Sequence, residues 1–174
     1  MRVSSTALLI LFCFILCCCS TRAADKSPGT NGARQEQEDD IREAVFRYQF
    51  ATNEVSKAEV YFLSVGLGKA GHIIFDASHD PSDAFVKRFA DSKPIVKKAS
   101  ASDFGSPSGW VADKRSGKRG VLFCARTIKW VSETEVEVNG GFVAGMMYAR
   151  DFTYTLVKEK GKWRIKRSEL TGLS

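Results

Sequence analysis

The residues with the clearest potential for metal chemistry lie together near the middle of the chain. His72, Asp76, His79 and Asp80 place two imidazoles and two carboxylates within one short segment. Side chains of these types bind divalent metals when a fold brings them together. The two histidines do not have a standard ligand spacing, and Asp80 precedes Pro81 in a sequence typical of a helix start. We therefore predict no metal site and no cofactor.

A second set of residues has the chemistry needed for acid–base catalysis. Such catalysis requires a titratable base within hydrogen-bond reach of a donor. The candidates are Tyr48, Tyr61, Tyr148, Tyr154, Asp76, Asp103 and Asp151. Their spacing matches no catalytic motif, and tyrosines commonly pack with the ring buried and the hydroxyl at an edge. The sequence therefore favours structural roles for them.

Cys124 is the one candidate thiol nucleophile outside the first 23 residues. It lies in the alternating segment Leu122–Ala125, where a cysteine usually acts as a small buried apolar residue. A reactive thiol needs a neighbouring base or a lowered pKa, and no sequence signature supplies either. The chain also contains no nucleophile-elbow, phosphate-loop or dinucleotide-binding motif.

Positive charge is concentrated in two predicted turns. One contains Lys114, Arg115, Lys118 and Arg119, and the other lies within 158–167. A nucleic-acid site would need aromatic residues interleaved with these charges on an exposed face. Here the basic residues occupy turns or alternate with apolar residues on strands, which is typical of solvated edges. We predict no nucleic-acid partner.

The elements that position these residues follow from the hydrophobic pattern. Apolar residues at three- and four-residue steps predict a helix from Asp39 to Thr52, and β-forming residues predict a strand at Val60–Val65. Asp80 is the predicted N-cap of a helix from Pro81 to Ala90. The remaining predicted strands are Ile95–Ser100, Trp110–Asp113 paired with Gly120–Phe123, Val121–Val131, Thr134–Val138, Phe142–Tyr148, Phe152–Lys158 and Trp163–Arg167.

These elements define a single α+β domain. Turn signals at Asn139-Gly140-Gly141 and Lys160-Gly161 separate strands that read as an antiparallel meander. N-terminal helices followed by a meander predict helices packed on one face of a strongly curved antiparallel sheet. A chain of 174 residues with 44% hydrophobic residues is long enough for one such core.

The first residues of the chain resemble a secretory signal. Arg2 precedes an apolar run too short to span a bilayer comfortably, and Thr21-Arg22-Ala23 predicts cleavage after Ala23. Residues 1–23 are therefore predicted as a signal peptide and 24–37 as a flexible spacer, with the folded domain at 38–174. We expect an exported protein, periplasmic or extracellular. The alternative is a lipoprotein anchored at Cys19, which would provide the only membrane attachment.

The order of elements resembles the nuclear transport factor 2-like superfamily, whose fold is a cystatin-like α+β cone. The residues that carry this resemblance are Ile128–Val138 and the terminal hairpin Tyr154–Ile165, which has a charged glycine turn followed by Trp163. The resemblance covers residues 38–174 and implies a cavity between the first helix and the sheet. It also implies a homodimer through the outer sheet face.

The resemblance predicts the fold more specifically than the function, because one fold hosts many unrelated sites. The leading hypothesis is an exported, non-catalytic binding or interaction domain whose partner is a small apolar ligand or a protein. The alternative is a small-molecule enzyme of the isomerase or dehydratase type that uses the cone cavity. A side-chain-filled interior favours the first hypothesis. The predicted cavity-lining residues are Phe46, Tyr48, Phe50, Tyr61, Trp130 and Tyr148.

Overall fold

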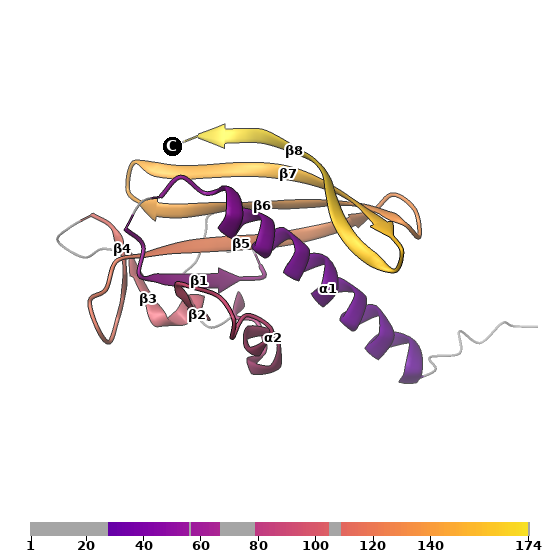
Figure 1. Ribbon diagram of the computed structural model, residues 1–174, viewed down its shortest axis with the longest axis horizontal. Coiled ribbons are helices and arrows are strands. Elements are labelled where there is room, and N and C mark those ends of the chain that lie inside the picture. The colour runs from indigo at the N-terminus through magenta and orange to yellow at the C-terminus, as the bar shows by residue number, and fades with distance from the viewer. Residues whose placement is uncertain (1–27, 56, 67–78, 105–108, 174) are drawn as a thin grey trace, which may run out of the picture.

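A six-stranded sheet with helices on one face forms the body of the molecule (Figure 1). The computed structural model describes residues 28–55, 57–66, 79–104 and 109–173. The predicted signal peptide therefore lies outside the described residues. In chain order the elements are α1 (Pro28–Thr52), β1 (Val60–Ser64), α2 (Asp83–Lys87), β2 (Ile95–Lys98), a 3₁₀ turn (Ala99–Ala101), β3 (Ser102–Phe104), β4 (Val111–Asp113), β5 (Gly120–Trp130), β6 (Glu135–Gly145), β7 (Tyr148–Glu159) and β8 (Lys162–Leu173).

The sheet is mostly antiparallel, and the predicted α+β class is confirmed. Its strand order is β2-β1-β5-β6-β7-β8, in which β1 runs parallel to both β2 and β5. Strands β5 to β8 form an antiparallel meander. A separate two-stranded ladder joins β3 to β4. Among the described helices, none is long and apolar enough to cross a membrane.

Helix α1 begins at Pro28, well before the predicted start at Asp39. Residues 28–37, predicted as part of a flexible spacer, are instead its first turns. Side-chain pairs one helical turn apart support them: Arg34 pairs with Glu38 at 3.5 Å, and Gln35 donates to Asp39 at 2.9 Å. The Arg34 guanidinium also lies 3.9 Å from the ring centre of Trp130. A long-range cation–π contact thus holds a segment whose composition alone indicates no packing.

The start of α2 also differs from the prediction. Its N-cap is Ser82, whose hydroxyl accepts a hydrogen bond from Phe85 N at 3.1 Å. Asp80 instead accepts a hydrogen bond from Ser100 N at 2.9 Å. The Asp80 carboxylate therefore joins the segment before α2 to the 3₁₀ turn after β2.

Strand β6 runs straight through Asn139-Gly140-Gly141, which was wrongly predicted as a turn. The glycines are needed because other backbone atoms approach them closely. A Cβ on Gly140 would lie 2.5 Å from Cys124 O, and one on Gly141 would lie 2.2 Å from Arg150 O. Glycine inside a strand often marks such an approach. The two strands predicted on either side of this segment are one strand.

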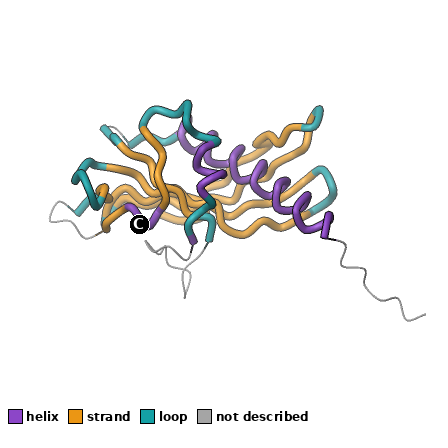
Figure 2. The backbone as a smooth tube through the Cα atoms, turned by 90° about the horizontal axis from the view of Figure 1, so that it is seen from below, coloured by secondary structure: helices purple, strands orange, loops and turns teal. Residues whose placement is uncertain are grey.

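Side chains pack on both faces of the sheet. Figure 2 shows α1 crossing one face. Its buried residues Ile41, Val45, Phe46 and Gln49 form a helical stripe against that face. The opposite face of β1, β5 and β6 carries Val60, Phe62, Leu122 and Val143, which pack with Ala99 and Val111 from the 3₁₀ turn and β4. The small β3–β4 ladder thus covers part of the second face.

Asp113 links the end of β4 to the main sheet. We expect it to make the free energy of unfolding depend on pH. Its carboxylate is buried, forms an ion pair with Lys97 of β2, and accepts backbone hydrogen bonds from Arg115 and Ser116 at 2.9 and 3.0 Å. The Lys97 hydrogen bond, with help from these amides, lowers the pKa of Asp113 from 3.8 to about 2. This stabilisation is present above pH 4 and is lost as pH falls toward 2.

We expect Asp113→Asn to lower the free energy of unfolding by about 2 kcal/mol at neutral pH. The difference from the unmodified protein should shrink toward zero near the folded-state pKa of about 2. Denaturant titrations across this pH range measure it. Lys97→Met should produce a similar loss, because the carboxylate then lacks its partner. A difference that stays constant with pH would contradict the ion-pair explanation.

Candidate functional site

The space between α1 and the sheet is filled by aromatic side chains. Phe46 is fully buried, and its ring centre lies 6.0 Å from that of Phe85 and 6.1 Å from that of Phe89. The ring centres of Phe50 and Tyr61 are 4.8 Å apart, and those of Phe50 and Phe123 are 5.1 Å apart. Three of the predicted cavity-lining residues, Phe46, Phe50 and Tyr61, therefore belong to the core.

Trp130 lies elsewhere, where β5 and β8 meet the first half of α1. It packs edge to face against Trp163, with ring centres 5.6 Å apart, and Arg34 covers it from the helix. This cluster joins α1 to the β7–β8 hairpin. Within the described residues, the six predicted lining positions are thus divided among several regions.

A cavity of about 170 Å³ remains at the C-terminal end of α1. Its volume is below the range of about 300–1,000 Å³ common for ligand sites. The described lining residues include Tyr48, one of the predicted positions, but no carboxylate. They are Tyr48, Gln49, Thr52, Asn53, Phe142, Arg150, Phe152, Tyr154 and Ser168.

Gln49 organises the polar groups beneath this cavity. Its buried Nε2 donates to Cys124 O at 3.1 Å and to Gly141 O at 3.2 Å, and lies 3.2 Å from the Tyr154 hydroxyl. Burial raises the pKa of Tyr154 and raises that of Cys124 to about 12. Both groups therefore keep their protons at neutral pH, and the thiol has the inert character expected from its strand position.

The nearest candidate base is already engaged. Asp151 forms an ion pair with Arg126 at 2.7 Å, and Arg150 pairs with Glu54 at 3.3 Å. A general base must reach the proton that it removes. Within the described part of the chain, the tyrosines of this cavity have no carboxylate beside them in its wall. The cavity thus lacks the acid–tyrosine pair on which the enzyme hypothesis depended.

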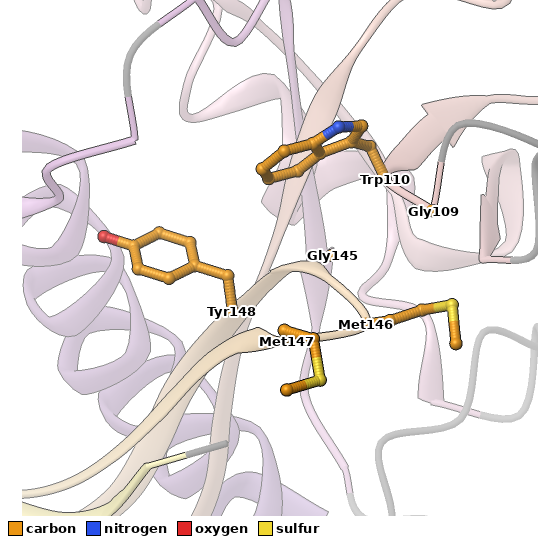
Figure 3. A pocket seen from close by; sticks show the side chains of 6 residues that line it. All are labelled: Gly109, Trp110, Gly145, Met146, Met147 and Tyr148. Carbon is orange, nitrogen blue, oxygen red and sulfur yellow. The ribbon is translucent and has the colours of Figure 1, made fainter.

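A larger concavity lies at the turn between β6 and β7 (Figure 3). It has a volume of about 410 Å³ and is lined mainly by apolar atoms. Its described lining residues are Gly109, Trp110, Gly145, Met146, Met147 and Tyr148. We call it the turn pocket. It contains one predicted position, Tyr148.

Local backbone structure fixes the turn pocket. Trp110 forms an antiparallel bridge with Gly145, and Met146 N donates to Gly109 O at 3.0 Å. A Cβ on Gly145 would lie 2.9 Å from both Gly109 O and the Trp110 ring, so glycine permits this approach. The β6–β7 register shifts between Val143 and Gly145, directly before the turn.

Two methionines form the outer wall. Met146 is 70% exposed, and Met147, at 86%, is the most exposed large apolar side chain of the described residues. Methionine is flexible and polarisable, and it is common at surfaces that bind varied apolar partners. In Figure 3 the Trp110 and Tyr148 rings stand on the other side of the turn from these sulfurs. The result is an accessible apolar site with rigid aromatic rings on one side and flexible methionine side chains on the other.

Each aromatic ring of the turn pocket has an arginine beside it. The Arg119 guanidinium carbon lies 3.6 Å from the ring centre of Trp110, and that of Arg150 lies 5.6 Å from the ring centre of Tyr148. Such contacts hold aromatic rings in place and bring positive charge close to them. The pocket is therefore apolar inside, with the positive charge of Arg119 beside it, whereas Arg150 also pairs with Glu54 at 3.3 Å.

A groove of about 450 Å³ between α1 and the β7–β8 turn is less suited to binding. Its lining includes Asp40, Glu43, Arg47 and Trp163. Glu43 pairs with Arg47 at 2.8 Å, and Asp40 pairs with Arg88 at 2.7 Å. Because these charges satisfy one another, a ligand would have to compete with existing ion pairs.

The histidine–aspartate cluster is only partly described. His72 and Asp76 lie outside the described residues, while Asp80 bonds to Ser100. The His79 ring packs against Gly66, where an added Cβ would lie 1.9 Å from Cδ2. Over the ranges that the structure covers, no three metal-binding side chains come together.

Trp110, Met146 and Met147 line the turn pocket but were not predicted from the sequence. The available signal was the adjacent Met146-Met147 pair directly after a glycine, because large apolar residues are unusual in an exposed turn. Comparisons of the chain with protein-family models, curated protein sequences and solved structures found no significant match. The site must therefore be interpreted from its own chemistry.

Proposed function

We propose that this protein is an exported, non-catalytic binding domain that takes an apolar group into the turn pocket. The observation that carries the proposal is an accessible apolar concavity bordered by two exposed methionines. Exposed apolar patches on soluble proteins commonly mark interaction sites. The volume is within the range of small-molecule sites. An apolar ligand or an apolar side chain of a partner protein fits this chemistry.

The proposal includes a nuclear transport factor 2-like, cone-shaped fold. Support comes from a long helix packed across one face of a sheet whose last four strands form a meander. The terminal hairpin also carries Trp163 directly after its charged glycine turn, and this residue lines the groove beside α1. In this fold the helix–sheet interior would be occupied by side chains, and binding would take place at the end of the sheet.

A homodimer through the outer sheet face belongs to the same proposal. On β5, β6 and β8 this face carries the ion pairs Lys129–Glu137 at 2.9 Å and Lys166–Glu135 at 3.5 Å. Such a dimer would have a polar interface, and its association would weaken with added salt.

The isomerase or dehydratase alternative would use the cavity at the end of α1. Tyr48 and Tyr154 are present there, with ring centres 5.9 Å apart. Against it stand the small volume and the raised pKa of Tyr154, which keeps the hydroxyl protonated. The filled interior favours the binding function.

Titration with a neutral apolar dye, N-phenyl-1-naphthylamine, tests the proposed function. Its fluorescence rises when it leaves water for an apolar site. We expect saturable binding that Met147→Asp weakens at least tenfold, because a charge in the pocket wall must be desolvated when the dye binds. The side chain is largely exposed, so the substitution should leave folding intact.

Val131→Asp is the matched control, since it places the same charge at an exposed apolar position outside the pocket. Its dye affinity should equal that of the unmodified protein. Equal affinity of the Met147→Asp protein would rule out the turn pocket as the binding site.

A further inference from the structure

We propose that the end of the sheet bearing the turn pocket docks on a lipid membrane that contains anionic lipids. The proposal rests on the proposed binding function and names the apolar partner as the interfacial region of a bilayer. The sequence predicts membrane attachment only through an N-terminal anchor. The exposed side chains of the folded domain provide a separate contact.

Several exposed apolar side chains occupy this end of the molecule. Met146 and Met147 form the β6–β7 turn, and Leu173, at the end of β8, is 71% exposed. Leu173 pairs with Arg150, two residues after Tyr148, so β8 ends beside this turn. Figure 1 shows the β6–β7 turn and the C-terminus at the same end of the sheet. Apolar side chains grouped in this way can enter the boundary between headgroups and acyl chains.

Basic side chains border the same end. The turn after β4 exposes Lys114, Arg115 and Lys118, of which Lys118 pairs with Glu59 at 3.3 Å, and Arg119 returns to the Trp110 ring. Backbone contacts tie this turn to the pocket: Ala112 bridges Arg119, and Trp110 bridges Gly145. Basic residues near an anionic leaflet each strengthen binding about fivefold. The charge of this end is therefore complementary to anionic headgroups.

The combination of exposed apolar side chains with basic residues favours a lipid surface over a protein partner. The most exposed methionine projects from a turn, and a projecting apolar tip suits insertion into a deformable layer. The opposite end of the sheet also carries Lys160 and Lys162 at the β7–β8 turn, but the one large exposed apolar side chain among its described residues is Val131, at 54%. Positive charge alone therefore does not distinguish the two ends, whereas the number and the exposure of the apolar side chains beside it do.

Vesicle co-sedimentation of the purified protein tests this inference. The vesicles are phosphatidylcholine alone, or an equal mixture of phosphatidylcholine and phosphatidylglycerol. We expect binding to the mixed vesicles to exceed binding to neutral vesicles at least tenfold and to weaken with added salt. Met146→Ser/Met147→Ser should reduce binding to mixed vesicles at least tenfold. Lys114→Gln/Arg115→Gln should reduce it about 25-fold.

Lys160→Gln/Lys162→Gln is the matched control, because it removes the same charge at the other end of the sheet. We expect it to leave vesicle binding within about twofold of the unmodified protein, since these side chains would lie beyond the screening length. Equal losses from the two charge-removing pairs would show binding by net charge and overturn the proposed orientation. Equal binding to both vesicle types would also overturn the proposal.

Dye binding separates this inference from the proposed function. A protein that binds the dye in the turn pocket but neither vesicle type retains the proposed function and refutes membrane docking. If an acidic, apolar peptide then displaces the dye, the partner is a protein segment. If the unmodified protein binds neither the dye nor the vesicles, both proposals are overturned.

Discussion

Phe46→Ala is expected to lower the free energy of unfolding by about 3–5 kcal/mol. Phe46 is fully buried and contacts the rings of Phe50, Phe85 and Phe89. Truncation would leave an apolar void that its neighbours can close only in part. Truncation of a residue that lined an open cavity would lower the free energy of unfolding much less, because solvent or ligand already occupies the space beside it. Denaturant unfolding monitored by tryptophan fluorescence measures the loss.

Phe46→Leu provides the matched comparison, since it keeps most of the buried volume. We expect it to cost about one-third as much as the alanine variant. A loss below about 1 kcal/mol for Phe46→Ala would contradict a filled interior and return support to the cavity-based enzyme hypothesis. The experiment therefore tests both the packing and the choice between the two functions.

Gly141→Ala is expected to destabilise the protein by about 3 kcal/mol or to prevent folding. The added Cβ would lie 2.2 Å from Arg150 O and 3.0 Å from Asp151 Oδ1. The nearest obstacle is backbone and cannot rotate away, so β6 and β7 would have to separate. The loss should appear in thermal unfolding and in faster hydrogen exchange of the amides paired between these strands.

Gly32→Ala is the control for this substitution. Gly32 lies in α1, and an added Cβ there would meet no atom within 4 Å. Because alanine favours a helix, we expect a gain of about 0.5–1 kcal/mol. No change on Gly32→Ala would indicate that this part of α1 adds nothing to stability. A harmless Gly141→Ala would refute the close packing of β6 on β7.

The elements that could be predicted are those in which the spacing of apolar residues along the sequence matches the spacing of buried residues in the structure. Alternation predicted the meander, and the stripe including Ile41, Val45 and Gln49 predicted the second half of α1. The errors occurred where long-range contacts override local preference. Asn139-Gly140-Gly141 has the composition of a turn, but its glycines serve a backbone approach within β6. The first turns of α1 have the composition of a spacer, but Arg34 reaches Trp130.

The candidate site could be predicted only in small part. An aromatic residue in the sequence can be a packed ring such as Phe46 or an accessible one such as Tyr148. Both side chains are large and have an apolar ring, so residue type alone does not separate the two cases. The distinction depends on how closely α1 approaches the sheet. The turn pocket depends on the bridge between Trp110 and Gly145, which joins residues far apart in the chain. No local pattern encodes that contact.

The direction of α1 determines which end of the protein can carry a fusion partner without covering the proposed binding surface. The helix has 25 residues and would extend roughly 37 Å. In Figure 1 its first residue lies at the end of the molecule remote from the β6–β7 turn. A label or immobilisation handle placed upstream of Pro28 would stand clear of Met147. One placed after Leu173 would stand beside it and compete for the same surface.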